Sequence, residues 1–303
     1  MLSFGRTLLA LACVFACGTN PEQGHGMPAK ATKAVPRGGE ARWFSVPDGR
    51  MKGRVYSSVR LTSHPLLVIV LHGDIPKPPP SYHYDFAQAA AEGFDSVVSL
   101  PESARAIFGS GPDIHDLVAA GLVRPGYADG SGDRSGGDMG YGIADNYTPR
   151  VVDDVAAAIH QLQTQFKPRA TVVVGHSGGA AIMANLLGRH PDIANAALLV
   201  ACGCDPVKAR ARWKAKQGDP IFDQPNPSLL PLEMAAFVSL KVKVRLIVGA
   251  LDDNALPEYS ESYAQALRAH GVDASVEVLP GLKHDILFSP PAFKSLEQLL
   301  AQY

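Results

Sequence analysis

Four stretches of the chain are continuously apolar, with no alternation between apolar and polar positions. Strands of this kind are buried on both faces, which is typical of a parallel sheet covered by helices on either side. A fifth stretch, 274–279, alternates as a partly exposed strand does. The pattern predicts an α/β fold, a three-layer α/β/α sandwich with a mostly parallel central sheet. The four continuous runs are 66–71, 171–174, 196–201 and 245–250.

The segments between these strands carry helix start and stop signals. Thr148 followed by Pro149 is typical of a helix start, and the apolar positions of 150–166 recur on one side of the predicted helix. Ser289 with two prolines after it marks the start of a last helix in the same way. Another helix is predicted over 258–270.

Residues 175–179 read Gly-His-Ser-Gly-Gly, between an apolar strand and a helix-forming stretch. The short motif alone is weak, because a glycine-rich chain contains it easily by chance. Its context is stronger, since Gly175 and Gly179 let strand and helix approach closely at a sharp turn that exposes the Ser177 side chain. The helix then directs free amides and its positive dipole end at the reacting group. The context predicts that Ser177 is a nucleophile.

A serine hydroxyl needs a base to take its proton and an acid to orient that base. Asp252 and Asp253 follow the strand 245–250, and either carboxylate is a candidate acid. His284 lies in the turn after the last predicted strand and is the candidate base. The chain order Ser, Asp, His is that of α/β hydrolases, and it differs from the orders in chymotrypsin and subtilisin.

From about Val68 to Tyr303 the chain resembles the α/β hydrolases, and its last third resembles the prolyl oligopeptidase and dienelactone hydrolase branches. In the Gly-x-x-Asp-Asp-Asn pattern of that family the first aspartate is the acid, which implies Asp252. The proline register of simpler hydrolases implies Asp253 instead. The residues that carry the resemblance are Gly249-Ala-Leu-Asp252-Asp253-Asn254, Ser260, Tyr263-Ala264, Ala266-Leu267, Gly271 and Pro280-Gly281 with His284.

A second element of the resemblance is Leu71-His72-Gly73-Asp74, which follows the strand 66–70. It implies that the backbone amide of Asp74 joins that of Gly178 as an oxyanion hole, which stabilises the charge formed in the transition state. We expect His72 to order this loop, because it precedes the nucleophile in the chain. His176 fills the variable position of the motif, where packing or a local hydrogen bond is expected.

Two apolar stretches, 94–100 and 117–123, compete for the next core strand. The second is preferred, because Arg124-Pro-Gly-Tyr127 after it resembles the turn that follows this strand in bacterial hydrolases. Residues 126–142 contain too much glycine for regular structure, and a loop of this length is more often functional than idle. We expect it to border the substrate cleft.

With 303 residues, 46% of them hydrophobic, the chain has enough material for one large core. We expect one hydrolase domain over 41–303, with insertions at about 76–115 and 204–240. The basic residues of 208–216 alternate at a spacing of two, which spreads them around a solvated helix.

Charge and motifs exclude several other classes of function. The formal net charge is −1 and no basic stripe is interleaved with aromatic residues, so no nucleic-acid partner is predicted. The sequence has neither an HExxH motif nor paired CxxC motifs, and the cluster of Asp113, His115 and Asp116 is interpreted as hydrated surface. We therefore predict no metal and no other cofactor.

The first residues are typical of export. The apolar stretch 7–16 is too short to span a bilayer and has one charged residue, Arg6, before it, so 1–17 is interpreted as a signal peptide. Residues 18–40, rich in Gly, Pro, Ala and Lys, are predicted to be a flexible linker. Val14-Phe15-Ala16-Cys17 resembles a lipoprotein box, although Phe15 departs from it. A membrane lipid anchor through Cys17, in the periplasm or envelope, and simple secretion are both left open.

An exported chain is exposed to conditions that permit disulfides. Cys202 and Cys204 are separated by one residue, so a bond between them closes a tight ring. Two packed thiols and a disulfide are therefore equal alternatives.

Together these features predict an exported serine hydrolase that cleaves a carboxylic ester through an acyl-enzyme, with Ser177, His284 and Asp252 as its triad. An ester is preferred because the sequence carries no propeller-like gating domain of the oligopeptidases. A small serine peptidase or aminoacyl amidase acting on a short peptide is the first alternative. A non-catalytic binding protein on a hydrolase scaffold is the second, because one fold can host unrelated functions.

Overall fold

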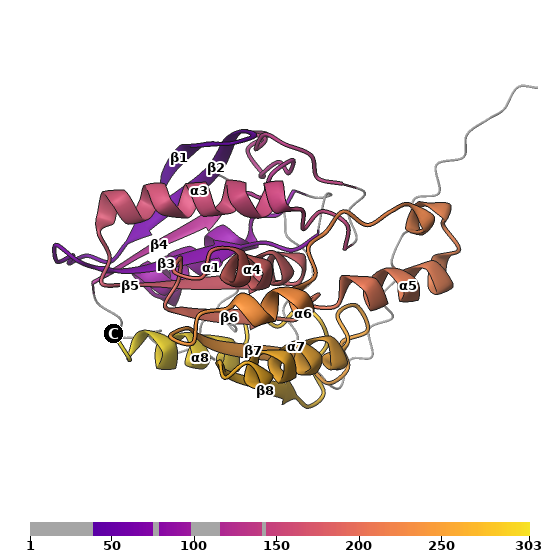
Figure 1. Cartoon of the computed structure of the whole chain (residues 1–303). Helices are drawn as coiled ribbons and strands as arrows, with labels where there is room; N and C mark the ends of the chain where they lie inside the picture. Colours follow the sequence, from indigo (N-terminus) through magenta and orange to yellow (C-terminus); the bar gives the residue numbers. More distant parts are fainter. Residues whose placement is uncertain (1–38, 75–78, 98–115, 141–143) are drawn as a thin grey trace, which may run out of the picture.

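A single mixed sheet forms the centre of the protein in the computed structural model, which describes residues 39–74, 79–97, 116–140 and 144–303 (Figure 1). The eight strands lie in the order β1-β2-β4-β3-β5-β6-β7-β8. The pairs β1–β2 and β2–β4 are antiparallel, and all later pairs are parallel, which confirms the predicted mostly parallel sheet. The strands are β1 (Glu40–Val46), β2 (Gly49–Ser57), β3 (Leu66–Leu71), β4 (Leu117–Leu122), β5 (Ala170–His176), β6 (Ala196–Val200), β7 (Lys243–Gly249) and β8 (Asp273–Leu279).

Helices cover both faces of the sheet (Figure 1). Residues 67, 69 and 71 of β3 belong to one apolar core, and residues 66, 68 and 70 belong to the other, because successive strand side chains point to opposite faces. This is why the run is continuously apolar, and it confirms the three-layer sandwich. One face carries α3 (Pro149–Phe166), α4 (Gly178–Arg189), α6 (Pro231–Met234) and α7 (Pro257–Ala269), and the other carries α1 (Tyr82–Glu92) and α8 (Pro290–Leu300).

The predicted helix starts are confirmed by their caps. The Thr148 hydroxyl accepts a hydrogen bond from Val151 N at 3.2 Å, and Pro149 occupies the first turn of α3. The Ser289 hydroxyl caps α8 in the same way, with two prolines in its first turn. A side-chain oxygen at this position satisfies an amide that the helix itself leaves free.

Of the two apolar stretches considered for the next core strand, the preferred one forms it. Residues 117–122 are β4, which lies between β2 and β3 in the sheet. Residues 94–96 form instead a short 3-10 helix, η1 (Phe94–Ser96). The β1–β2 hairpin at the sheet edge was not predicted. The predicted signal peptide 1–17, nearly all of the predicted linker 18–40, and most of the predicted insertion 76–115 lie outside the described residues.

The segment between β6 and β7 contains α5 (Pro206–Gln217), η2 (Pro220–Asp223), α6 and η3 (Ala235–Phe237). Helix α5 extends from the body of the molecule in Figure 1. Lys208 and Lys214 are exposed, as predicted for a solvated helix, but Arg210 is buried, so the prediction is wrong there. The reason is that Arg210 Nη2 donates to the carbonyl oxygens of Ile221 and Gln224, both at 3.1 Å. Among the described helices, none combines the length and the apolar character needed to cross a membrane.

Candidate active site

The predicted site residues all follow the carboxyl ends of parallel strands. Open α/β sheets bind their ligands at this edge, because the loops there converge. Asp74 follows β3, Ser177 follows β5, Asp252 follows β7 and His284 follows β8.

Ser177 occupies a strained turn between β5 and α4. Its backbone angles are φ 55° and ψ −122°, a conformation that residues with a side chain rarely adopt. A Cβ atom on Gly175 would lie 2.5 Å from Ala180 Cα, and one on Gly179 would lie 2.3 Å from the carbonyl oxygen of His72. The two glycines therefore let strand, turn and helix pack this closely, which is the geometry of a nucleophile elbow.

Asp252 and His284 contact each other directly. His284 Nδ1 lies 2.9 Å from Asp252 Oδ2, and the Asp252 side chain is fully buried. Asp252 Oδ1 accepts hydrogen bonds from the backbone amides of Asn254 and Ala255, both at 2.9 Å. The Asp253 side chain is 76% exposed and lies 4.0 Å from Lys216 Nζ. Of the two candidate acids, Asp252 is therefore the one that contacts the histidine.

Ser177 Oγ and His284 Nε2 have no hydrogen-bond partner among the described residues. Because Nδ1 bonds to Asp252, Nε2 is the ring nitrogen left to exchange a proton with a substrate or with Ser177. Hydrogen bonds between catalytic groups are often made only when substrate is bound.

Tyr82 and His176 connect the nucleophile region to the histidine loop. Burial lowers the pKa of His176 to about 3, so the ring is neutral. His176 Nε2 donates to the carbonyl oxygen of His284 at 3.3 Å, which leaves Nδ1 to accept from the Tyr82 hydroxyl at 3.0 Å. The hydroxyl oxygen in turn accepts from Gly73 N at 2.6 Å. The local hydrogen bonding expected of His176 is present, whereas the part played by Tyr82 was not predicted.

The other side of the site consists of the loop after β3 and the start of α4. Neither the backbone N–H of Asp74 nor that of Gly178 has an acceptor in the described part of the chain. Gly73 packs against the nucleophile, since a Cβ there would lie 2.8 Å from Ser177 Cβ. His72 is fully buried, its Nδ1 donates to the Gly73 carbonyl oxygen at 2.8 Å and its Nε2 accepts from Arg124 N at 3.0 Å. This is the structural role expected of His72.

A charged network that the sequence did not reveal surrounds the Asp74 side chain. One carboxylate oxygen accepts from Arg124 Nη1, and the other accepts from the Tyr147 hydroxyl at 2.7 Å. Arg124 has no exposed side-chain surface. The one signal for it in the sequence was its place in the turn after β4, which served to choose the strand and not to assign a function.

Cys202 and Cys204 form a disulfide directly after β6, with Cα atoms 5.1 Å apart, which settles the alternative left open by the spacing. Both residues are buried. Gly203 between them donates its N–H to the Ser177 carbonyl oxygen at 3.4 Å. The disulfide loop thus contacts the backbone of the candidate nucleophile.

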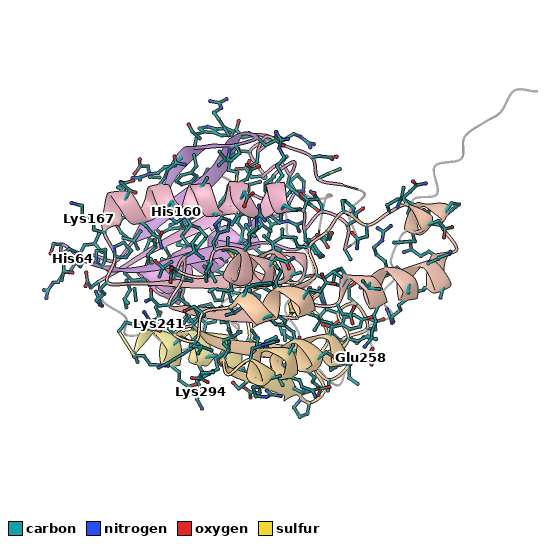
Figure 2. All side chains as sticks on the ribbon, viewed as in Figure 1. His64, His160, Lys167, Lys241, Glu258 and Lys294 are labelled. Atoms are coloured by element: carbon teal, nitrogen blue, oxygen red, sulfur yellow. A yellow bond between two sulfur atoms is a disulfide. The ribbon has the colours of Figure 1, made fainter. Side chains whose placement is uncertain are left out.

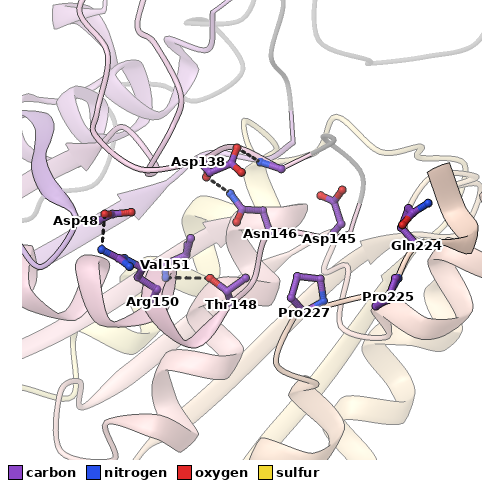
Figure 3. Close-up of a pocket in the computed structure, with 11 residues that line it drawn as sticks. Asp48, Asp138, Asp145, Asn146, Thr148, Arg150, Val151, Gln224, Pro225 and Pro227 are labelled. Atoms are coloured by element: carbon purple, nitrogen blue, oxygen red, sulfur yellow. Dashed lines mark hydrogen bonds and ion pairs between the residues drawn. The ribbon is translucent and has the colours of Figure 1, made fainter.

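A cavity of about 490 Å³ lies between the glycine-rich segment and the inserted segment after β6 (Figure 3). Asp138 and Gly140 line it from one side, and Gln224 with Pro225 and Pro227 line it from the other. Asp145 and Asn146 also line the cavity, and the next residue in the chain is Tyr147, whose hydroxyl contacts Asp74. The glycine-rich segment therefore borders a cavity, and its contact with substrate stays a prediction.

His160 is not part of this site. His160 is exposed on α3, as expected for a residue on the outer helix face (Figure 2). In the described ranges, no three His, Cys, Asp or Glu side chains are grouped so that they could hold a metal ion.

The sheet order, the elbow and the residues at the strand ends together define an α/β hydrolase. Within this class, residues 127–301, more than half of the chain, match the model of the prolyl oligopeptidase family. The chain belongs to this family. No curated protein matches the sequence significantly.

Solved structures of peptidases and esterases share the fold. An acylaminoacyl peptidase from Pyrococcus horikoshii has 14% sequence identity and a TM-score of 0.60, over 87% of this chain and 40% of its own. A puromycin hydrolase has 17% identity and a TM-score of 0.60, over 87% and 39%. An esterase from Pyrococcus furiosus has 12% identity and a TM-score of 0.60, over 91% and 99%. The chain thus spans about two fifths of the acylaminoacyl peptidase and of the puromycin hydrolase, and nearly all of the esterase.

Proposed function

We propose that this protein is a serine esterase in which Ser177, His284 and Asp252 form the catalytic triad. The observation that carries the proposal is the 2.9 Å contact between His284 Nδ1 and the buried Asp252 carboxylate, at the same sheet edge as the strained turn of Ser177. A buried carboxylate on Nδ1 orients the ring and stabilises its protonated form.

In the first step of the proposed reaction, Ser177 Oγ attacks the ester carbonyl carbon while its proton passes to His284 Nε2. The carbonyl oxygen becomes an oxyanion, which accepts hydrogen bonds from the backbone N–H groups of Asp74 and Gly178. The tetrahedral adduct collapses, and His284 gives its proton to the leaving alcohol. Water then attacks the acyl-enzyme, His284 takes the water proton, and a second collapse releases the acid and returns the proton to Ser177.

An ester is favoured over a peptide because the fold matches that of the Pyrococcus furiosus esterase over nearly the whole of that enzyme. The Pyrococcus furiosus esterase and the Est1E protein of Butyrivibrio proteoclasticus match over 99% and 98% of their lengths, whereas the peptidases match over about 40%. A small serine peptidase or aminoacyl amidase is the second candidate, and membership of the prolyl oligopeptidase family favours it.

The test of the proposed nucleophile is labelling by a fluorophosphonate probe. Wild-type protein should label at pH 7 to 8, and Ser177→Ala should abolish both labelling and turnover. Ser275→Ala is the matched control, since Ser275 is exposed on β8 and should leave both unchanged. A wild-type protein that resists the probe from pH 6 to 9 would contradict the proposal. A panel of p-nitrophenyl esters and aminoacyl amides then separates an esterase from a peptidase.

We further propose that the protein is exported, either secreted or held at a bacterial membrane by lipid on Cys17. The support is the sequence of residues 1–17 alone, which lie outside the described part of the chain. Fractionation of cells that express the full chain tests it. A lipoprotein should incorporate labelled palmitate and lose the label in Cys17→Ser, whereas a secreted protein should be processed without it. Unprocessed protein in the cytoplasm would argue against both.

A further inference from the structure

The oxyanion side of the site holds a charge that the proposed reaction does not use. The Asp74 carboxylate lies against Gly178, since a Cβ atom built on Gly178 would lie 2.3 Å from Oδ1 and 2.5 Å from Cγ of Asp74. An anion this close to an amide that must receive a second anion opposes formation of the tetrahedral intermediate. A working oxyanion hole at this position therefore needs a counter-charge.

Arg124 has the placement of such a counter-charge. Its Nη1 donates to Asp74 Oδ1, and in the described ranges Asp74 is the one carboxylate paired with it. Arg124 Nε and Nη2 are buried and have no hydrogen-bond partner among the described residues. The guanidinium carbon lies 4.7 Å from the ring centre of Tyr127 and 5.8 Å from that of Tyr147, and aromatic faces stabilise a cation that is removed from water. A buried cation with three of its five N–H donors unpaired among the described residues is explained better by its charge than by its hydrogen bonds.

The Asp74 carboxylate is also prevented from turning toward the reacting centre. Oδ2 accepts from the Tyr147 hydroxyl at 2.7 Å and from Ala144 N at 3.4 Å. Arg124 binds the same loop through its backbone, since its N–H donates to His72 Nε2 at 3.0 Å. The network thus places a positive charge beside the Asp74 carboxylate and holds that carboxylate in one orientation.

We propose that Arg124 is a positioning residue of the reaction, and that it neutralises Asp74 so that the amides of Asp74 and Gly178 can stabilise the oxyanion. The inference rests on the proposed serine hydrolase chemistry. Arg124 does not touch the substrate, and it acts through Asp74.

The test compares steady-state ester hydrolysis by Arg124→Met and by the double variant Arg124→Met with Asp74→Asn. Methionine keeps an unbranched, apolar side chain at this position but has neither the guanidinium group nor its charge. The single variant should lose about 100-fold in kcat with KM within about threefold, because the uncompensated carboxylate acts on the oxyanion and not on the bound substrate. The double variant has neither charge and should recover to within about tenfold of wild type.

The outcomes separate three cases. Recovery in the double variant supports neutralisation, because a role limited to bracing the loop predicts that loss of both ion-pair members is no better than loss of one. A double variant as slow as the single one overturns the inference and leaves the proposed function intact. A wild-type protein without fluorophosphonate labelling overturns the proposed function and the inference together.

Two further measurements keep the test decisive if Arg124→Met does not fold, as judged by circular dichroism and thermal unfolding. A folded double variant more than about 100-fold slower than wild type would by itself contradict neutralisation. Arg124→Lys keeps the charge without the planar donor group, so it should stay within about tenfold of wild type in kcat. A larger loss in folded Arg124→Lys would show that the geometry of the pair, and not its charge, is required.

Discussion

The two sides of the candidate active site stabilise their carboxylates in different ways. The Asp252 carboxylate accepts hydrogen bonds from the backbone amides of Asn254 and Ala255 in its own loop. It also contacts His284, which follows the next strand, β8. Asp74 is held by Arg124 and Tyr147, which are 50 and 73 residues away in the chain. The acid side is therefore assembled largely from its own loops, whereas the oxyanion side depends on distant segments. A substitution far from any recognisable motif should thus disturb the oxyanion side more readily than the acid side.

The largest expected effect comes from the acid side. Asp252→Asn should lower kcat by about 10³- to 10⁴-fold, because an amide neither stabilises the protonated ring nor fixes the correct tautomer. Asp253→Asn is the matched control, and it should stay within about twofold of wild type since its side chain is largely exposed. The rate of ester hydrolysis at saturating substrate gives kcat for both variants. The reverse order of losses would assign the acid to Asp253 and contradict the proposed triad.

On the oxyanion side, Gly178→Ala should reduce kcat by about 100-fold, since the new Cβ would overlap the Asp74 carboxylate and displace it from Arg124. Gly203→Ala is the matched control. Its Cβ would meet the Tyr147 hydroxyl at an ordinary 3.6 Å, so activity should change by less than about threefold. The comparison is made on proteins with unchanged thermal unfolding. Equal effects of the two substitutions would mean that the Asp74 carboxylate is not held in this position.

The oxyanion side also contains buried neutral histidines, and these predict a pH dependence of stability. Burial lowers the pKa of His83 to about 3, and neither of its ring nitrogens has a hydrogen-bond partner in the part of the chain that the structure describes. His83 packs on His72, with ring centres 4.9 Å apart. Below pH 6.5 the unfolded chain binds a proton that the folded protein does not, so the free energy of unfolding falls as the pH falls from 6.5 toward 3.

His83→Phe should remove the contribution of His83 to this dependence and leave those of His72 and His176. Between pH 7.5 and 4.5 the wild-type free energy of unfolding should fall by about 3 kcal/mol more than that of the variant, at about 1.4 kcal/mol per pH unit below 6.5. Urea unfolding at the two pH values measures the difference. His160→Gln, at an exposed position on α3, is the control and should keep the wild-type dependence. An unchanged pH dependence in His83→Phe would show that this ring is not the group that resists protonation.

Much of the fold could be predicted because its signals are local. The four continuous apolar runs, the caps of α3 and α8, and the small residues around Ser177 each depend on neighbours within a few positions of the chain. The β1–β2 hairpin was not predicted, because it lies at a sheet edge and lacks a continuous apolar run. Arg210 was misplaced for a related reason, since helix periodicity does not show that the backbone of η2 folds back onto it.

The sequence by itself determined the class of fold, the order of the parallel strands in the chain, and the positions of a serine, a histidine and two aspartates at strand ends, because periodicity and chain order carry that information. Only the tertiary structure showed that Asp252 and not Asp253 contacts His284, joined Cys202 to Cys204, and brought Arg124 to Asp74. Each of these depends on the direction of a side chain in a loop or on the distance between separate segments. Such distances are fixed by the packing of the whole sheet and not by any local pattern.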